Sequence, residues 1–104
     1  MDEYKPIIET TAHSDLRGIL RYITDTLKEP VTAKRIYTSI KEKINGLDRL
    51  PHRNPLVRDD TLSSCGIRWM PAENYTVFYT IDDENLKVHI LRILHNRREW
   101  QSLL

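Results

Sequence analysis

The sequence is poor in the residues that build disulfide frameworks and thiol metal sites, and it has no long apolar run. Its 104 residues include one cysteine, Cys65, which excludes an internal disulfide and a CxxC site and suits a reducing compartment. No apolar run approaches about 18 residues, and the first residues lack the basic and then apolar pattern of a signal peptide. We therefore expect a cytoplasmic protein that does not contact the membrane, folded as a single domain over residues 1–104.

The chain also has almost no net charge. Its 16 Lys and Arg residues against 15 Asp and Glu leave +1, so the large basic excess of proteins that coat nucleic acid non-specifically is absent. The HExxH, Walker, GxGxxG and GxSxG motifs are missing, and the aspartate pairs lack the spacing of a calcium loop. No metal or cofactor is therefore expected, and any contact with nucleic acid has to be local.

The first half of the chain predicts a strand and then a helix. The strand is expected over Tyr4–Thr10, and Pro6 confines it to a sheet edge or to the first residues of the strand. From Leu16 onward, apolar residues recur at the three-and-four spacing of one helical face, which indicates an amphipathic helix. Thr11 or Ser14 is available as its amino-terminal cap.

A second helix follows directly. Glu29 precedes a proline and so avoids helical angles, while Pro30 suits the first turn of the next helix. That helix keeps an apolar stripe as far as Leu47, and Pro51 closes it. So short a connection predicts an antiparallel helix hairpin whose two apolar stripes face the same way.

The second half predicts a loop and three strands. Residues Pro51–Ser64 are polar and interrupted by proline, which indicates a surface loop. The spacing then becomes near-alternating over Gly66–Met70, Tyr75–Ile81 and Leu86–Leu94, with hairpin-sized links between them. The last strand is apolar on both faces in its second half, as expected inside a sheet. The fold class is therefore α+β, in the order β-α-α-β-β-β, with an antiparallel-rich sheet covered on one face by the helix hairpin.

Basic side chains concentrate near the end of the last strand, in a chain that is otherwise neutral. The candidates for chemistry are Arg68 on the first late strand and, after it, Arg92, His95, Arg97 and Arg98. Guanidinium groups hold phosphates by bidentate contacts, and an imidazole that titrates near neutrality can move a proton. RNA cleavage needs this set, because a base activates the 2′ hydroxyl, cations stabilise the phosphorane and an acid protonates the leaving oxygen.

Ordinary structural roles stay open for the same residues. Arg68 and Arg92 can pair with acidic side chains across the sheet, and His95 can be a structural residue at the strand end. Trp69 and Trp100 can stack on bases or fill the edge of the core.

Three stretches, Asn74–Tyr79, Leu91–Trp100 and the Leu-x-x-Leu-Pro pattern at Leu47–Pro51, together resemble the RelE/ParE superfamily of bacterial type II toxin-antitoxin toxins. Residues Asn74–Tyr79 and Leu91–Trp100 look like the closing hairpin of these proteins. The Leu-x-x-Leu-Pro pattern at Leu47–Pro51, which ends the helix hairpin, is similar to their middle part, so the resemblance covers nearly the whole chain. It implies a small growth-arresting toxin, associated with plasmid stabilisation, that is encoded beside an antitoxin which wraps it and folds on binding.

The resemblance implies two kinds of target. One branch of the superfamily cleaves messenger RNA on the ribosome, and we place this chain there as the leading hypothesis of a metal-independent endoribonuclease that inhibits translation. In it, Arg68 and Arg97 hold phosphate, His95 is acid or base, and Arg98 supports charge. Arg92 is a further RNA contact.

Trp100 is expected to contact RNA as well, and the acidic antitoxin is expected to place its carboxylates over Arg92, Arg97 and Arg98. Two departures favour the alternative, a toxin that poisons DNA gyrase without nuclease chemistry. Thr76 follows the strand tyrosine where a basic residue is frequent, and Arg68 stands where two lysines are frequent. A third hypothesis is a toxin whose harmful activity has decayed and which only binds antitoxin.

Overall fold

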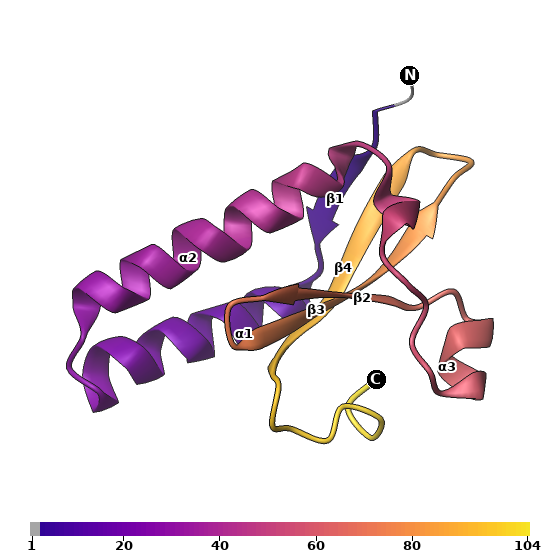
Figure 1. The fold of residues 1–104 in the computed structure, drawn as a ribbon. Helices are drawn as coiled ribbons and strands as arrows, with labels where there is room; N and C mark the ends of the chain where they lie inside the picture. Colours follow the sequence, from indigo (N-terminus) through magenta and orange to yellow (C-terminus); the bar gives the residue numbers. More distant parts are fainter. Residues whose placement is uncertain (1–2) are drawn as a thin grey trace.

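The structure is a computed structural model that describes residues 3–104, and it is built on one four-stranded sheet (Figure 1). Its strands are β1 (Lys5–Ile8), β2 (Arg68–Ala72), β3 (Tyr75–Asp82) and β4 (Lys87–His95). Their order is β1-β4-β3-β2, with β1 parallel to β4 and the other neighbours antiparallel. The predicted α+β class, the antiparallel-rich sheet and the interior position of the last strand are confirmed.

Two long helices form the predicted hairpin. They are α1 (Thr10–Arg21), which the π-helical turn η1 (Tyr22–Thr26) extends, and α2 (Pro30–Asn45). Pro30 lies in the first turn of α2, as predicted. No helix among residues 3–104 is long and apolar enough to cross a membrane.

The start of α1 differs from the prediction. The helix begins at Thr10 with Glu9 as its N-cap, which makes no side-chain cap hydrogen bond, so neither Thr11 nor Ser14 caps it. The backbone N–H of Glu9 donates to Ile90 O on β4 at 3.0 Å. The sheet therefore holds the chain up to the first helical residue, and the helix needs no side-chain cap.

Both helices cover the same face of the sheet, as predicted. The core on this face takes Leu16 and Ile23 from the first helix, Ile40 and Ile44 from the second, and alternate residues of the strands. Those strand residues are Met70, Ala72, Tyr75, Val77, Tyr79, Val88, Ile90 and Ile93. The period of two along β2 and β3 produces this one-sided set, and in β4 the period is interrupted between Ile90 and Ile93, where the pairing register shifts.

The other face carries a second, smaller core, which overturns the expectation of a surface loop over Pro51–Ser64. Val57 of that segment is buried against Phe78 and Leu94, and its N–H donates to Ile67 O at 2.9 Å. The same segment contains the 3₁₀ turn η3 (Pro51–Arg53) and the short helix α3 (Asp60–Ser64). Val57 and the partly buried Leu62 pack against this core from an otherwise polar stretch, and periodicity does not detect such isolated apolar residues.

Each edge strand contains a proline whose backbone nitrogen faces the outer edge of the sheet. The N–H of Lys5 donates to Leu86 O just before β4, and the N–H of Glu9, just after β1, donates to Ile90 O, so the nitrogen of Pro6 between them faces outward. In β2, which begins two residues later than predicted, the N–H of Trp69 donates outward to Pro55 O at 3.1 Å, so Pro71 also points outward. Each proline removes a donor from the free edge.

Candidate functional site

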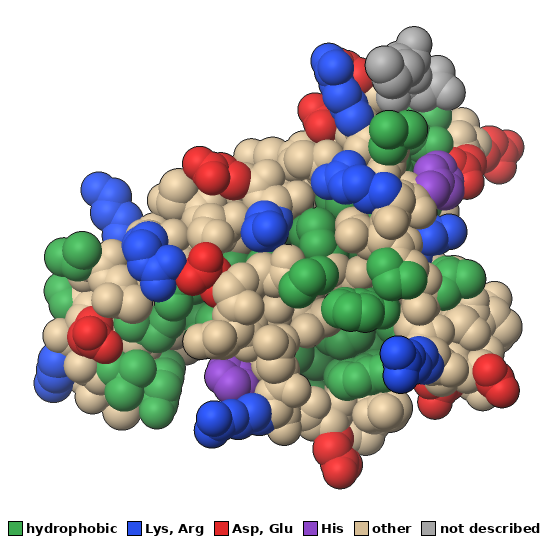
Figure 2. Space-filling view, in the orientation of Figure 1, with side chains coloured by type: hydrophobic (Ala, Val, Ile, Leu, Met, Phe, Trp, Pro, Cys, Tyr) green, Lys and Arg blue, Asp and Glu red, His purple; other side chains and the backbone are tan. Residues whose placement is uncertain are grey.

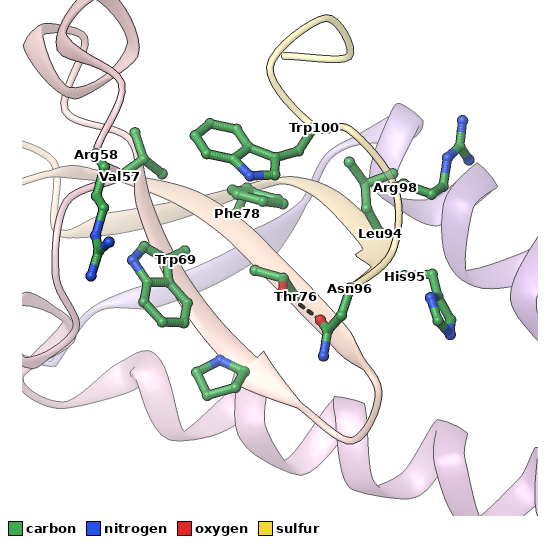
Figure 3. Close-up of a pocket in the computed structure, with 11 residues that line it drawn as sticks. Val57, Arg58, Trp69, Thr76, Phe78, Leu94, His95, Asn96, Arg98 and Trp100 are labelled. Atoms are coloured by element: carbon green, nitrogen blue, oxygen red, sulfur yellow. Dashed lines mark hydrogen bonds between the residues drawn. The ribbon is translucent and has the colours of Figure 1, made fainter.

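A groove of about 420 Å³ lies on the sheet face opposite the helix hairpin, and we call it the aromatic groove (Figure 3). Its apolar lining comes from Val57, Trp69, Pro71, Phe78, Leu94 and Trp100. Its polar and charged lining comes from Arg58, Thr76, His95, Asn96 and Arg98. Strand alternation explains the floor, because every lining residue of β2 and β3 points away from the helices.

Three aromatic rings define the shape of the groove. Phe78 and Trp69 are cross-strand partners on the floor. Trp100, which follows β4, lies over Phe78 with ring centroids 5.3 Å apart and an interplanar angle of 32°. Aromatic pairs at such distances add to the stabilisation from burial. Trp100 thus forms a wall that belongs to a different segment from the floor.

Within the described residues 3–104, the groove is lined by cations and by no acidic side chain. Arg58 and Arg98 stand at its sides, and Thr76 donates a 2.7 Å hydrogen bond to Asn96 Oδ1 at the rim. Figure 2 shows the hydrophobic side chains gathered between Lys or Arg side chains on this side of the molecule. The groove therefore suits a partner that is apolar and carries negative charge.

His95 lies at the strand end beside the groove, and its ring is turned toward Tyr75 on the helix side of the sheet. Its ring meets Tyr75 edge-on, with centroids 5.4 Å apart, and its Nδ1 accepts from the Arg97 N–H at 3.1 Å. The neutral ring then carries its proton on Nε2. Burial raises the pKa of Tyr75, so that hydroxyl stays protonated at physiological pH.

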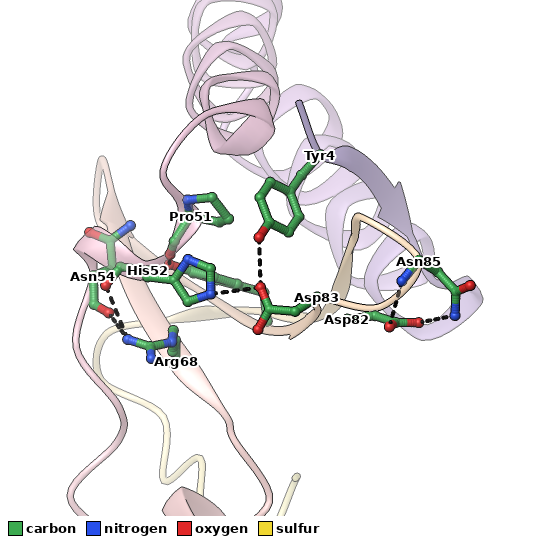
Figure 4. A network of polar contacts seen from close by, with 9 residues as sticks. Tyr4, Pro51, His52, Asn54, Arg68, Asp82, Asp83 and Asn85 are labelled. Carbon is green, nitrogen blue, oxygen red and sulfur yellow. Dashed lines mark hydrogen bonds and ion pairs between the residues drawn. The ribbon is translucent and has the colours of Figure 1, made fainter. Parts of the chain in front are cut away.

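Arg68 lies at the other end of the sheet and on its other face. It pairs with Tyr79 on β3, whereas His95 pairs with Tyr75, four residues away, which is about 13 Å along a strand. Its guanidinium donates to the carbonyls of His52 at 3.2 Å and Asn54 at 2.6 Å (Figure 4). The structure does not bring Arg68 to the groove.

The same end of the sheet holds a polar network around Asp83 (Figure 4). Asp83 Oδ1 accepts from the Tyr4 hydroxyl at 2.6 Å and lies 2.9 Å from His52 Nε2. The Tyr4 hydrogen bond and then the His52 contact lower the pKa of Asp83. These contacts join the residue before β1, η3 and the β3–β4 turn, so we interpret the network as structural.

Arg92 points to the groove side of the sheet but is engaged elsewhere. Its Nε and Nη2 bond both carboxylate oxygens of Asp15 on α1, at 2.7 and 2.9 Å, and Nη1 donates to Leu103 O at 2.9 Å. The two side chains are 18% and 12% exposed, and the Asp15 hydrogen bond raises the pKa of Arg92. Its predicted contacts with RNA or antitoxin compete with this ion pair.

Of the six residues predicted for the site, the groove contains His95, Arg98 and Trp100, and Arg97 is exposed beside it. Sequence reasoning did not select Arg58 or Asn96. Arg58 is placed by its buried neighbour Val57, and that apolar residue beside a basic one was the only available signal. No cluster of metal-ligating residues occurs between residues 3 and 104.

Comparisons with known proteins agree with the fold. A family model described as the ParE toxin of the type II toxin-antitoxin system parDE matches residues 7–100. The chain is similar to a chain of the chromosomal ParDE toxin-antitoxin system from P. aeruginosa, with a TM-score of 0.72 and 18% identity over 89% of this chain and 96% of that one.

A second solved structure is the RelBE2 toxin-antitoxin complex from Mycobacterium tuberculosis. The TM-score is 0.62 with 26% identity, over 89% of this chain and 98% of that one. No curated protein sequence matches the chain. Since the ParE model spans nearly the whole sequence, and the motifs Asn74–Tyr79 and Leu91–Trp100 fall on β3, β4 and the groove wall, the chain belongs to the ParE toxin family of type II toxin-antitoxin systems.

Proposed function

We propose that this toxin acts by binding DNA gyrase through the aromatic groove, without cleaving RNA. One observation carries the proposal: two of the arginines expected to contact RNA are engaged in bonds elsewhere in the fold. Arg68 is bound to the His52 and Asn54 carbonyls on the helix side, and Arg92 is bound to Asp15. His95 and Arg98 remain at the groove with Arg97 beside it, which leaves one imidazole where cleavage needs both a base and an acid.

The groove has the composition of a protein-binding surface. Tryptophan and arginine are the residues most enriched among those that dominate interface energies, and the groove contains Trp69, Trp100, Arg58 and Arg98. Its floor is apolar and its rim is charged, the usual arrangement of an interface core and its surround. The family match to ParE supports the same assignment.

A second candidate function is ribosome-dependent RNA cleavage. It is favoured by one specific arrangement, in which His95 and Arg98 stand beside two tryptophans that can stack on unpaired bases. When the His95 ring is protonated, its Nε2–H can be given to the leaving oxygen, which supplies this candidate with a general acid.

One pair of assays separates the two candidates. Purified toxin is added to a gyrase supercoiling reaction and to a ribosome-containing translation reaction. We expect inhibited supercoiling with accumulated cleaved DNA, and intact transcripts with normal protein synthesis. Cut transcripts with unaffected gyrase would instead establish the nuclease.

Variants test the role of the groove. Trp69→Ala is expected to weaken gyrase inhibition about 30-fold, the effect of removing one dominant interface residue of about 2 kcal/mol. Arg98→Glu is expected to weaken it as well. Lys34→Glu makes the same charge change on the exposed side of α2 and serves as the matched control. Equal inhibition by all three variants would exclude the groove.

The antitoxin is the second partner we propose for this surface. Arg97 and Arg98 are exposed and can receive the carboxylates of an acidic segment that folds on binding. The double variant Arg97→Glu with Arg98→Glu should lose co-purification with the product of the neighbouring gene. The Lys34→Glu variant should retain it.

A further inference from the structure

We infer that Asp15 and Arg92 are positioning residues, which hold the C-terminal tail (residues 96–104) where Trp100 walls the aromatic groove. This inference rests on the proposed function, because it explains how the groove is kept in shape. The pair crosses the molecule from the helix hairpin to the face on which the partner is expected to bind. Neither Asp15 nor Arg92 lines the groove itself.

The pair lies beside the part of β4 that has no neighbouring strand on the β1 side. β1 pairs with β4 as far as Ile90, and beyond this point the edge of β4 has no neighbouring strand. Asp15 bonds the backbone of β4 in place of a strand at this point. Its Oδ2 accepts the N–H of Ile93 at 3.0 Å while the same carboxylate binds the Arg92 guanidinium. Asp15 therefore fixes both the backbone and the guanidinium at one place.

Arg92, held in this position, also binds the tail. Its Nη1 donates to Leu103 O at 2.9 Å, and within residues 3–104 this is the only hydrogen bond that joins residues 99–104 to the rest of the chain. The other hydrogen bonds of that stretch are local, from Leu103 and Leu104 back to Trp100 O. One guanidinium thus determines where the end of the tail lies.

The apolar contacts of the tail do not by themselves fix the position of the tail. Trp100, Leu103 and Leu104 pack against the small core as partly buried residues, not as buried members of it. Apolar contact is non-directional, so it favours a collapsed tail without selecting one position for the indole ring. The directional bond from Arg92 supplies that selection.

The test measures how accessible the indole ring of Trp100 is to a quencher in solution. The chain has two tryptophans, so Trp69→Phe leaves Trp100 as the only indole while keeping an aromatic floor. In this background we expect Arg92→Gln to raise the acrylamide quenching constant of Trp100 at least twofold, because Gln cannot reach Asp15 and Leu103 together. Asp15→Asn should act in the same direction, since it removes the charge that orients the guanidinium.

The control breaks an ion pair of equal length elsewhere. Arg35→Gln removes the 2.7 Å contact with Glu73, which lies outside the groove, and should leave quenching unchanged. Far-UV circular dichroism identifies the folded variants, and Arg92→Lys, which keeps the charge but not the fork, is used if Arg92→Gln does not fold. Unchanged quenching in a folded Arg92 variant overturns the inference.

The gyrase assay on Arg92→Gln and Asp15→Asn in the parent chain, with Trp69 intact, separates this inference from the proposed function. Raised quenching with weakened gyrase inhibition supports both. Raised quenching with full inhibition supports the positioning role and overturns the groove as the gyrase site. Weakened inhibition with unchanged quenching overturns the positioning role, because activity is then lost without any movement of Trp100.

Discussion

Replacing Tyr79 by phenylalanine removes a single buried hydroxyl from the middle of β3. That hydroxyl donates to Pro51 O at 2.7 Å, and the side chain is fully buried. The change deletes a hydrogen bond with a net value of about 1 kcal/mol and leaves a buried carbonyl without its donor, which costs about 1 kcal/mol more. We expect the free energy of unfolding to fall by about 2 kcal/mol. For a domain of this length, the melting temperature should fall by about 9 °C.

Tyr75→Phe is the matched comparison. Tyr75 lies on the same face of the same strand and is also buried, but its hydroxyl has no hydrogen bond among the described residues. Its removal should change the free energy of unfolding by less than about 0.5 kcal/mol. Both variants are measured by urea unfolding, and the slope of the unfolding free energy against urea concentration is compared between the variants and the parent. Equal effects of the two substitutions would refute the reasoning, because they would show that the Pro51 contact adds nothing to burial.

Three further predictions concern pH and the sheet edges. Tyr4→Phe should raise the pKa of Asp83, measured by carboxyl NMR titration, because the Tyr4 hydrogen bond is the main cause that lowers it. A carboxyl whose pKa is lowered by folding stabilises the folded state at pH values above its ordinary range, and this stabilisation is lost as the pH falls. Because the Tyr4→Phe variant has less of it, the variant should lose less stability than the parent on acidification. Burial raises the pKa of Tyr75 and Tyr79, so stability present below about pH 10 should be lost as pH rises further, seen as a falling melting temperature in alkaline buffer. Pro71→Thr restores an outward N–H on β2 and should increase self-association in light scattering, with no increase if the edge is covered by other means.

The elements that local chemistry controls could be predicted from the sequence. Pro30 marked the start of α2 and Pro6 the edge position of β1, because proline restricts its own backbone and removes a donor. The alternation along Tyr75–Ile81 located β3 within one residue. These features depend on neighbours in the chain, which a sequence displays directly.

The grouping of the candidate site could not be predicted, because it depends on the register of β4. Phe78 pairs with Arg92 and Tyr79 with Ile90, so Leu91 is an extra residue and the strand has a bulge. Strict alternation would place Arg92 on the helix side with Ile90, but the bulge turns it to the other face. Its partner Asp15 is 77 residues away, and no local pattern reports that pairing.

The parallel pairing of β1 with β4 also sets when this toxin can acquire its structure. β4 is made after the other three strands, yet it lies between β1 and β3, and β1 has no other partner in the sheet. During synthesis, the helix hairpin and the β2–β3 hairpin can form early, but their apolar faces have no complete sheet to cover until residues 87–95 have left the ribosome. Trp100, the wall of the aromatic groove, follows β4 and can take its place only after that step. The groove is therefore incomplete in a nascent chain that lacks β4 and the residues after it.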